Sequence, residues 1–80
     1  MILDRLYEWG RKRRERKIIE AAKKRLPVEI EVSAGPFKKY WVYVNGVGVD
    51  WEPSFFAARS KALKIRKFLI NKGFQVEEIP

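Results

Sequence analysis

The stretch of residues 54–72 constrains the fold most, because its apolar side chains recur at the spacing of an α-helix that packs on another element. At about 100° per residue, one apolar stripe consists of Phe55, Ala58, Ala62, Ile65 and Leu69. A second apolar line, with a seven-residue spacing, consists of Phe56, Leu63 and Ile70. Ser54 is a typical N-cap and Gly73 a typical residue after a helix end. We predict a helix over 54–72 whose two apolar faces are covered by the rest of the chain.

The remaining faces of this predicted helix are basic. Its charged residues are all Lys or Arg: Arg59, Lys61, Lys64, Arg66, Lys67 and Lys72. Of the net charge of +8, residues 1–26 and 54–72 contribute +6 each, whereas residues 27–53 and 73–80 contribute −2 each. A polyanion would therefore meet the helical segments first.

Residues 1–26 are predicted to form the other helix, because they are rich in helix formers and Pro27 ends the pattern. Gly10 divides the apolar residues of this segment into two sets that lie on different sides of the helix. The first set consists of Leu3, Leu6 and Tyr7, and the second of Ile18, Ile19, Ala22 and Leu26. We predict that 15–26 packs on the domain. The preceding basic segment, 1–14, is predicted to be flexible or to dock separately.

Three short strands are predicted between the helices. Residues 28–33 alternate between apolar and polar side chains, as in a strand with one buried face. Asn45-Gly46 separates two apolar runs and is a preferred pair for a two-residue type I′ hairpin turn, where both residues need positive φ. The regular register then pairs three sets of residues on the core face. These pairs are Val44 with Val47, Val42 with Val49, and Tyr40 with Trp51.

The other face of this hairpin carries Trp41 and Tyr43, which the regular register places across from Asp50 and Gly48. A last strand is predicted over 74–79, and its inward side chains are Phe74 and Val76.

These elements predict a single small α+β domain over residues 1–80 in the order α-β-β-β-α-β. The sheet is mostly antiparallel, the second helix packs on one of its faces, and the N-terminal helix lies alongside. The line formed by Phe56, Leu63 and Ile70 needs its own partner. We expect Ile18, Ala22 and Leu26 to cover it, with a symmetric dimer as the alternative.

The composition excludes several classes of chemistry. The chain has no Cys and no His, and therefore lacks thiolate and imidazole metal ligands and the commonest general base. We expect no metal and no cofactor. No apolar run reaches the roughly 18–20 residues of a transmembrane helix, so we expect a cytoplasmic protein without a transmembrane segment. Abundant Lys, Arg, Glu and Ile give a thermophile-like composition.

The order of the elements resembles the core of restriction-endonuclease-like nucleases. The resemblance implies an acid on the second strand and an acid-x-Lys triplet on the third. Residues 39–45 contain no acid, and the triplet Asp50-Trp51-Glu52 has Glu in the place of Lys. We expect Asp50 and Glu52 to pair with nearby Lys or Arg, and we predict no catalytic residues and no enzyme.

The hairpin and helix over residues 40–69 resemble the small arm-type DNA-binding domains of tyrosine recombinases. That resemblance implies a three-stranded sheet that enters the major groove of DNA, although Asp50 and Glu52 depart from the family's pattern.

The charge pattern predicts a small nucleic-acid-binding protein whose two helices contact the phosphate backbone of DNA or RNA. The predicted contact residues are Arg11, Lys12, Arg13, Arg14, Arg16, Lys17, Lys61, Lys64, Lys67 and Lys72. Trp41 and Tyr43 are candidates for base stacking. A solvated basic surface without a ligand explains the same charges.

The alternative function is a protein-interaction module, such as a small plasmid or viral regulator that docks on an acidic partner, with a homodimer as one form. The apolar side chains without an assigned partner, such as Leu3, Leu6 and Trp9, favour this alternative.

Overall fold

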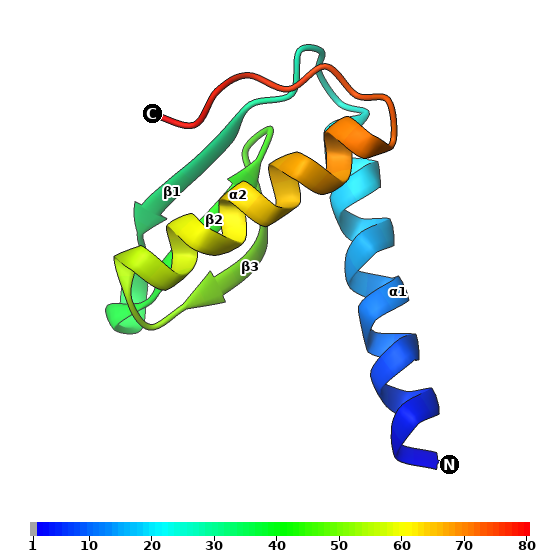
Figure 1. The fold of residues 1–80 in the computed structure, drawn as a ribbon. Coiled ribbons are helices and arrows are strands. Elements are labelled where there is room, and N and C mark those ends of the chain that lie inside the picture. The colour runs from blue at the N-terminus through cyan, green and yellow to red at the C-terminus, as the bar shows by residue number, and fades with distance from the viewer. Residues whose placement is uncertain (1) are drawn as a thin grey trace.

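The computed structural model describes the backbone of residues 2–80 and the side chains of residues 10–80. Its helices are α1 (Ile2–Ala22) and α2 (Phe55–Asn71). Its strands are β1 (Ile30–Ala34), β2 (Tyr40–Val44) and β3 (Val47–Glu52), and a short 3₁₀ turn, η1 (Pro36–Lys38), joins the first two. The predicted α+β class is confirmed (Figure 1).

The three strands form an antiparallel sheet in the order β1-β2-β3. Helix α2 crosses one face of this sheet, and α1 lies beside it with its N-terminal half extending beyond the sheet (Figure 1). The core contains buried side chains from the sheet segment and both helices. They are Val28, Ile30, Val42, Val44, Val49, Ala58, Ala62, Ile65, Leu69, Ile18, Ala21 and Ala22. Small alanines in both helices allow close approach to the valine face.

Helix α2 begins and ends as predicted. The Ser54 hydroxyl oxygen accepts a hydrogen bond from the Ala57 N–H at 3.2 Å. At the other end, Gly73 has φ +95°, its N–H donates to the Ile70 carbonyl, and the Phe74 N–H donates to the Leu69 carbonyl, both at 3.0 Å. These two bonds define a Schellman motif, which favours glycine because of the positive φ.

The predicted hairpin turn is confirmed, but the regular register is wrong beyond the first pairs. Asn45 and Gly46 have φ 49° and 82°, and Val44 pairs with Val47. A β-bulge opposite Val42 and Tyr43 then shifts the pairing by one residue, because Val49 of β3 has no partner on β2. The pairs beyond it are Val42 with Asp50, Trp41 with Trp51, and Tyr40 with Glu52. The bulge therefore places the acids of β3 on the α2 side of the sheet and Trp51 on the other side.

Helix α1 ends at Ala22, not at Leu26. The Asn45 side-chain amide donates to the carbonyls of Ala21, Ala22 and Arg25 at 3.0–3.2 Å. These are carbonyls at or just beyond the helix end, and the hairpin tip thus caps α1 five residues before Pro27. The backbone of α1 runs through Gly10 without interruption. The predicted contacts of Leu3, Leu6, Tyr7 and Trp9 fall outside the described side chains.

The predicted last strand forms only one parallel bridge, between Val76 and Val28. Two backbone hydrogen bonds hold it, from the Val28 N–H to the Gln75 carbonyl and from the Glu77 N–H to the Val28 carbonyl. Phe74 and Val76 are half-buried against the core, as their predicted inward position requires. Within the described residues, the backbone of the C-terminal segment pairs only with the chain that precedes β1, so it joins no ladder of the sheet.

The prediction that the N-terminal helix covers the second apolar line is wrong. Phe56, Leu63 and Ile70 are 84%, 44% and 43% exposed, and Leu26 is also exposed. At the helical period, this line lies on the far side of α2 from the residues buried against the sheet. A helix that shares the same core cannot reach it. Phe55, predicted in the core stripe, lies at its edge, and its ring contacts Tyr40 edge-on at 6.0 Å.

None of the helices in the described part of the chain has the length and apolar character that crossing a membrane requires.

Candidate nucleic-acid interface

The two basic helices meet at an acidic residue of β3. The Asp50 carboxylate oxygen Oδ2 lies 3.6 Å from Arg14 Nη1 of α1 and 3.1 Å from Lys61 Nζ of α2. Only 12% of the Asp50 side chain is exposed. Asp50 Oδ2 and Lys61 are close enough for an ion pair, but they are not aligned for a hydrogen bond. The other carboxylate oxygen of Asp50 accepts a hydrogen bond from the Trp51 N–H at 2.8 Å. Asp50 therefore links α1 to α2.

Lys61 has a second acidic partner, because its Nζ donates to Glu52 Oε1 at 2.8 Å. This hydrogen bond raises the pKa of Lys61 above its ordinary value of 10.5, against the opposing effect of partial burial, and Asp50 raises it further. Lys61 thus stays protonated at neutral pH and is held inside the domain. The expectation that Asp50 and Glu52 pair with nearby cations is confirmed.

A hollow of about 200 Å³ lies between the helices at this junction, and we call it the interhelical hollow. Its lining residues are Arg11, Arg14, Glu15, Ile18, Asp50, Lys61, Lys64, Ile65 and Phe68. Ile18 and Ile65 are buried, whereas Arg11, Arg14 and Lys64 are exposed. The apolar side chains therefore form the floor and the cations form the rim. Arg11 also pairs with Glu15 at 3.4 Å.

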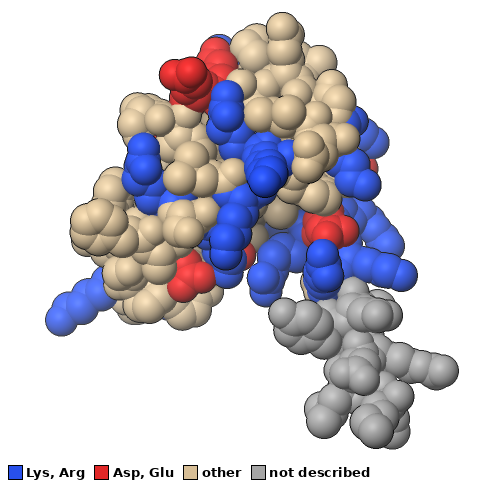
Figure 2. All heavy atoms as spheres, viewed as in Figure 1, with Lys and Arg blue, Asp and Glu red and all other residues tan. Residues whose placement is uncertain are grey.

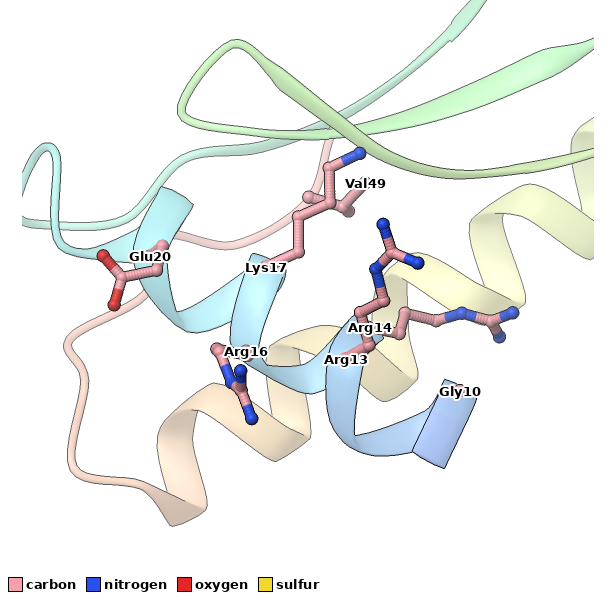
Figure 3. Close-up of a pocket in the computed structure, with 7 residues that line it drawn as sticks. All are labelled: Gly10, Arg13, Arg14, Arg16, Lys17, Glu20 and Val49. Carbon is pink, nitrogen blue, oxygen red and sulfur yellow. The ribbon is translucent and has the colours of Figure 1, made fainter. Parts of the chain in front are cut away.

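A second hollow, of about 690 Å³, lies on the other flank of α1 beside β3, and we call it the β3-edge hollow. Its lining residues are Gly10, Arg13, Arg14, Arg16, Lys17, Glu20 and Val49. Lys17 points toward the strand that carries Val49, and Arg13 and Arg14 lie beside it (Figure 3). Arg14 lines both hollows, so the cations of α1 are continuous around the Asp50 junction.

The structure brings together seven of the ten predicted phosphate-contacting residues at the two hollows, and three lie elsewhere. Lys12 and Lys67 are exposed and line neither hollow. Lys72 lies near the end of α2 with its Nζ 5.6 Å from the centre of the Phe68 ring. Lysine and arginine side chains of both helices gather on the face that carries α2 (Figure 2).

Trp41 and Tyr43 lie on the sheet face opposite α2, since their strand neighbours Val42 and Val44 face the core. Trp51 joins them there because of the bulge, and Lys39 Nζ lies 4.1 Å from the centre of its ring. The predicted stacking residues are therefore not on the same face as the cations of α2.

Two important residues of the site were missed from the sequence. Trp51 was assigned to the core, although Gly48, a glycine inside a strand, was a signal for a bulge. Asn45 was assigned only a turn role, and no local pattern reveals carbonyl partners some twenty residues earlier in the chain.

Residues 10–80 contain no group of three or more Asp and Glu side chains placed to hold a metal ion. Comparisons with protein-family models, with curated proteins and with solved structures give no match to this chain.

Proposed function

We propose that this protein binds nucleic acid without catalysis, and that the cations around the junction of α1 and α2 contact the phosphate backbone. One observation carries the proposal. Asp50 binds Arg14 of α1 and Lys61 of α2, and this shared carboxylate holds the other cations of both helices around one place. Fixed cations lose less conformational freedom on binding than mobile ones.

The geometry lowers the expected number of phosphate contacts. Lys61 is occupied by two carboxylates, and Arg14 is partly neutralised by Asp50. Arg16, Lys17 and Lys64 are exposed, and no carboxylate within residues 10–80 pairs with them. With about four phosphates neutralised, the plot of log affinity against log salt has a slope of about −3.6 for duplex DNA.

The sheet face opposite α2 gives this proposal a second part for single strands. Strand β3 carries Val49 at the β3-edge hollow and Trp51 on the aromatic face. A single strand whose phosphates contact Arg13 and Lys17 can therefore pass along β3 toward the aromatic rings, where its bases can stack. A duplex has no exposed bases to place there.

The test is a fluorescence-anisotropy titration with labelled duplex DNA, single-stranded DNA and RNA over a range of salt concentrations. The variant Arg13→Glu/Lys17→Glu changes the charge of the β3-edge hollow. The matched control, Lys24→Glu/Lys38→Glu, makes the same change in net charge at exposed positions that line neither hollow.

We expect micromolar binding that weakens steeply with salt, a loss of about tenfold or more in the hollow variant, and a much smaller loss in the control. Absence of binding at low salt would contradict the proposal. Equal losses in the two variants would also contradict it, because they would indicate attraction by net charge alone.

A further inference from the structure

Helix α2 exposes a line of large apolar side chains on its side away from the sheet. Phe56, Leu63 and Ile70 form this α2 ridge, and successive members are about 10 Å apart along the helix axis. No described side chain of α1 covers the ridge, because α1 packs at the opposite edge of α2, beside Lys61 and Phe68. None of the three ridge residues lines either of the two hollows around α1.

The charged residues of α2 beside the ridge are all positive, and one of them, Arg66, also donates from Nε to the Glu77 carbonyl of the C-terminal segment at 3.0 Å. At the helical period, Arg59 and Arg66 lie on one side of it, and Lys64 and Lys67 lie on the other. Helix α2 contains no Asp or Glu at all. The occupant of this face must therefore combine negative charge with an apolar layer beneath it.

A second copy of the chain does not meet this requirement. Two α2 helices packed ridge to ridge would bring like charges together along their whole length, without an acid on either helix to offset them. A coiled-coil partner also fits poorly, because it needs apolar residues three or four positions after each ridge residue. Arg59, Ser60, Arg66 and Lys67 occupy those positions.

We propose that the α2 ridge binds the surface of an anionic lipid bilayer. A bilayer interface supplies phosphate groups above acyl chains, and it deforms around a convex ridge. The apolar side chains enter the boundary between headgroups and chains, while the flanking Lys and Arg extend to the phosphates. The core already holds α2 as a helix through Ala58, Ala62 and Leu69, all fully buried, so binding needs no folding step.

The turn η1 adds a second apolar group at the end of the sheet where α2 begins (Figure 1). Phe37 is 86% exposed and has φ 64°, a left-handed conformation that a bulky side chain rarely adopts. Lys38 follows it with φ 56°. The turn exposes an aromatic ring and a cation at neighbouring positions, the same kinds of group that the α2 ridge presents.

The test is flotation with phosphatidylcholine vesicles that contain or lack phosphatidylglycerol. The variant Phe56→Ser/Leu63→Ser/Ile70→Ser removes the ridge at exposed positions, and circular dichroism verifies that it remains folded. The control Leu26→Ser removes an exposed apolar side chain that is not part of the ridge and lies beside the C-terminal end of α2. Anisotropy with labelled DNA is measured on every variant, which separates this proposal from nucleic-acid binding.

We expect the wild-type protein to float with the anionic vesicles only, and the ridge variant to lose at least about tenfold in vesicle affinity while it keeps its affinity for DNA. The control should behave like the wild type. The proposal is overturned if the protein ignores anionic vesicles, or if the ridge variant binds them as tightly as the wild type. A concentration-dependent dimer that the ridge variant abolishes would instead assign the ridge to a second copy and would also overturn it.

Discussion

Asn45 connects three parts of the molecule through one small side chain. Its backbone, at φ 49°, forms the hairpin turn, and its amide group donates to carbonyls at the end of α1. Its side-chain oxygen accepts the Glu29 N–H at 2.9 Å. The dipeptide Asn45-Gly46 predicted the turn because both residues tolerate positive φ. The longer-range contacts depend on tertiary packing, which local sequence does not encode.

Lys61 makes the stability of the domain depend on pH in the alkaline range. Its pKa is raised in the folded protein, chiefly by the hydrogen bond to Glu52, so its contribution to stability is complete below 10.5. That contribution is lost as the pH rises through the higher folded-state pKa. The variant Lys61→Met has no ammonium group to lose. The difference in free energy of unfolding between the wild type and this variant should therefore shrink above pH 10.5.

Urea unfolding of both proteins from neutral to alkaline pH measures this difference. A difference that stays constant, or grows, above pH 10.5 would show that Lys61 does not stabilise the fold through its ion pairs.

At the scale of elements, α2 was predictable and the register of β3 was not. Helix α2 carries its own signals, which are an apolar stripe, Ser54 before it and Gly73 after it. The hairpin has the correct turn but an unpredicted bulge, which changes the face on which Asp50, Glu52 and Trp51 lie. A slip of one residue moves every following side chain to the other face. The sequence therefore contained the acids of the junction without showing that they turn toward α2.

The aromatic face supplies a test of how tightly these strands are packed. A Cβ added at Gly35 would clash with two atoms of the Trp41 indole ring, Cδ1 and Nε1, and would lie 2.8 Å from Nε1. A Cβ at Gly48 would meet Trp41 and Tyr43 at 3.4–3.5 Å, an ordinary contact. We expect Gly35→Ala to cost about 1–3 kcal/mol of stability through overpacking against the stiff indole, and Gly48→Ala to cost clearly less.

Chemical unfolding followed by tryptophan fluorescence measures both variants, and each serves as the control for the other. A Gly35→Ala protein as stable as Gly48→Ala would mean that Trp41 moves away from β1 without cost.

For the whole molecule, the sequence predicted that the positive charge lies on the helices, but it did not predict how the helices face each other. The basic run of α1 and the lysines of α2 are separated by the whole sheet in sequence. Their placement follows from three tertiary contacts, namely the Asn45 cap on α1, the Asp50 junction and the packing of Ile18 in the core. The amino-acid composition could not indicate any of these three contacts. It also could not indicate that Lys61 pairs with the carboxylates of Asp50 and Glu52.

The Asp50 junction links stability to ligand binding across the whole molecule. Asp50 holds α1 and α2 together, but it also neutralises part of the charge that the proposed function uses. Asp50→Asn keeps the shape of the side chain and removes its charge. We therefore expect a less stable protein that binds nucleic acid about three to ten times more tightly, with a salt slope steeper by about one.

Thermal unfolding and anisotropy titrations over salt measure the two effects. Glu29→Gln is the matched control, because it removes one negative charge from an exposed pair with Arg25, 3.2 Å apart, outside both hollows. If the attraction is by net charge alone, the two variants gain affinity equally. If Arg14 becomes available when Asp50 loses its charge, while Lys61 keeps its bond to Glu52, only Asp50→Asn gains affinity and slope together, since a new phosphate contact changes both quantities. A gain confined to Glu29→Gln would exclude the junction from the binding surface.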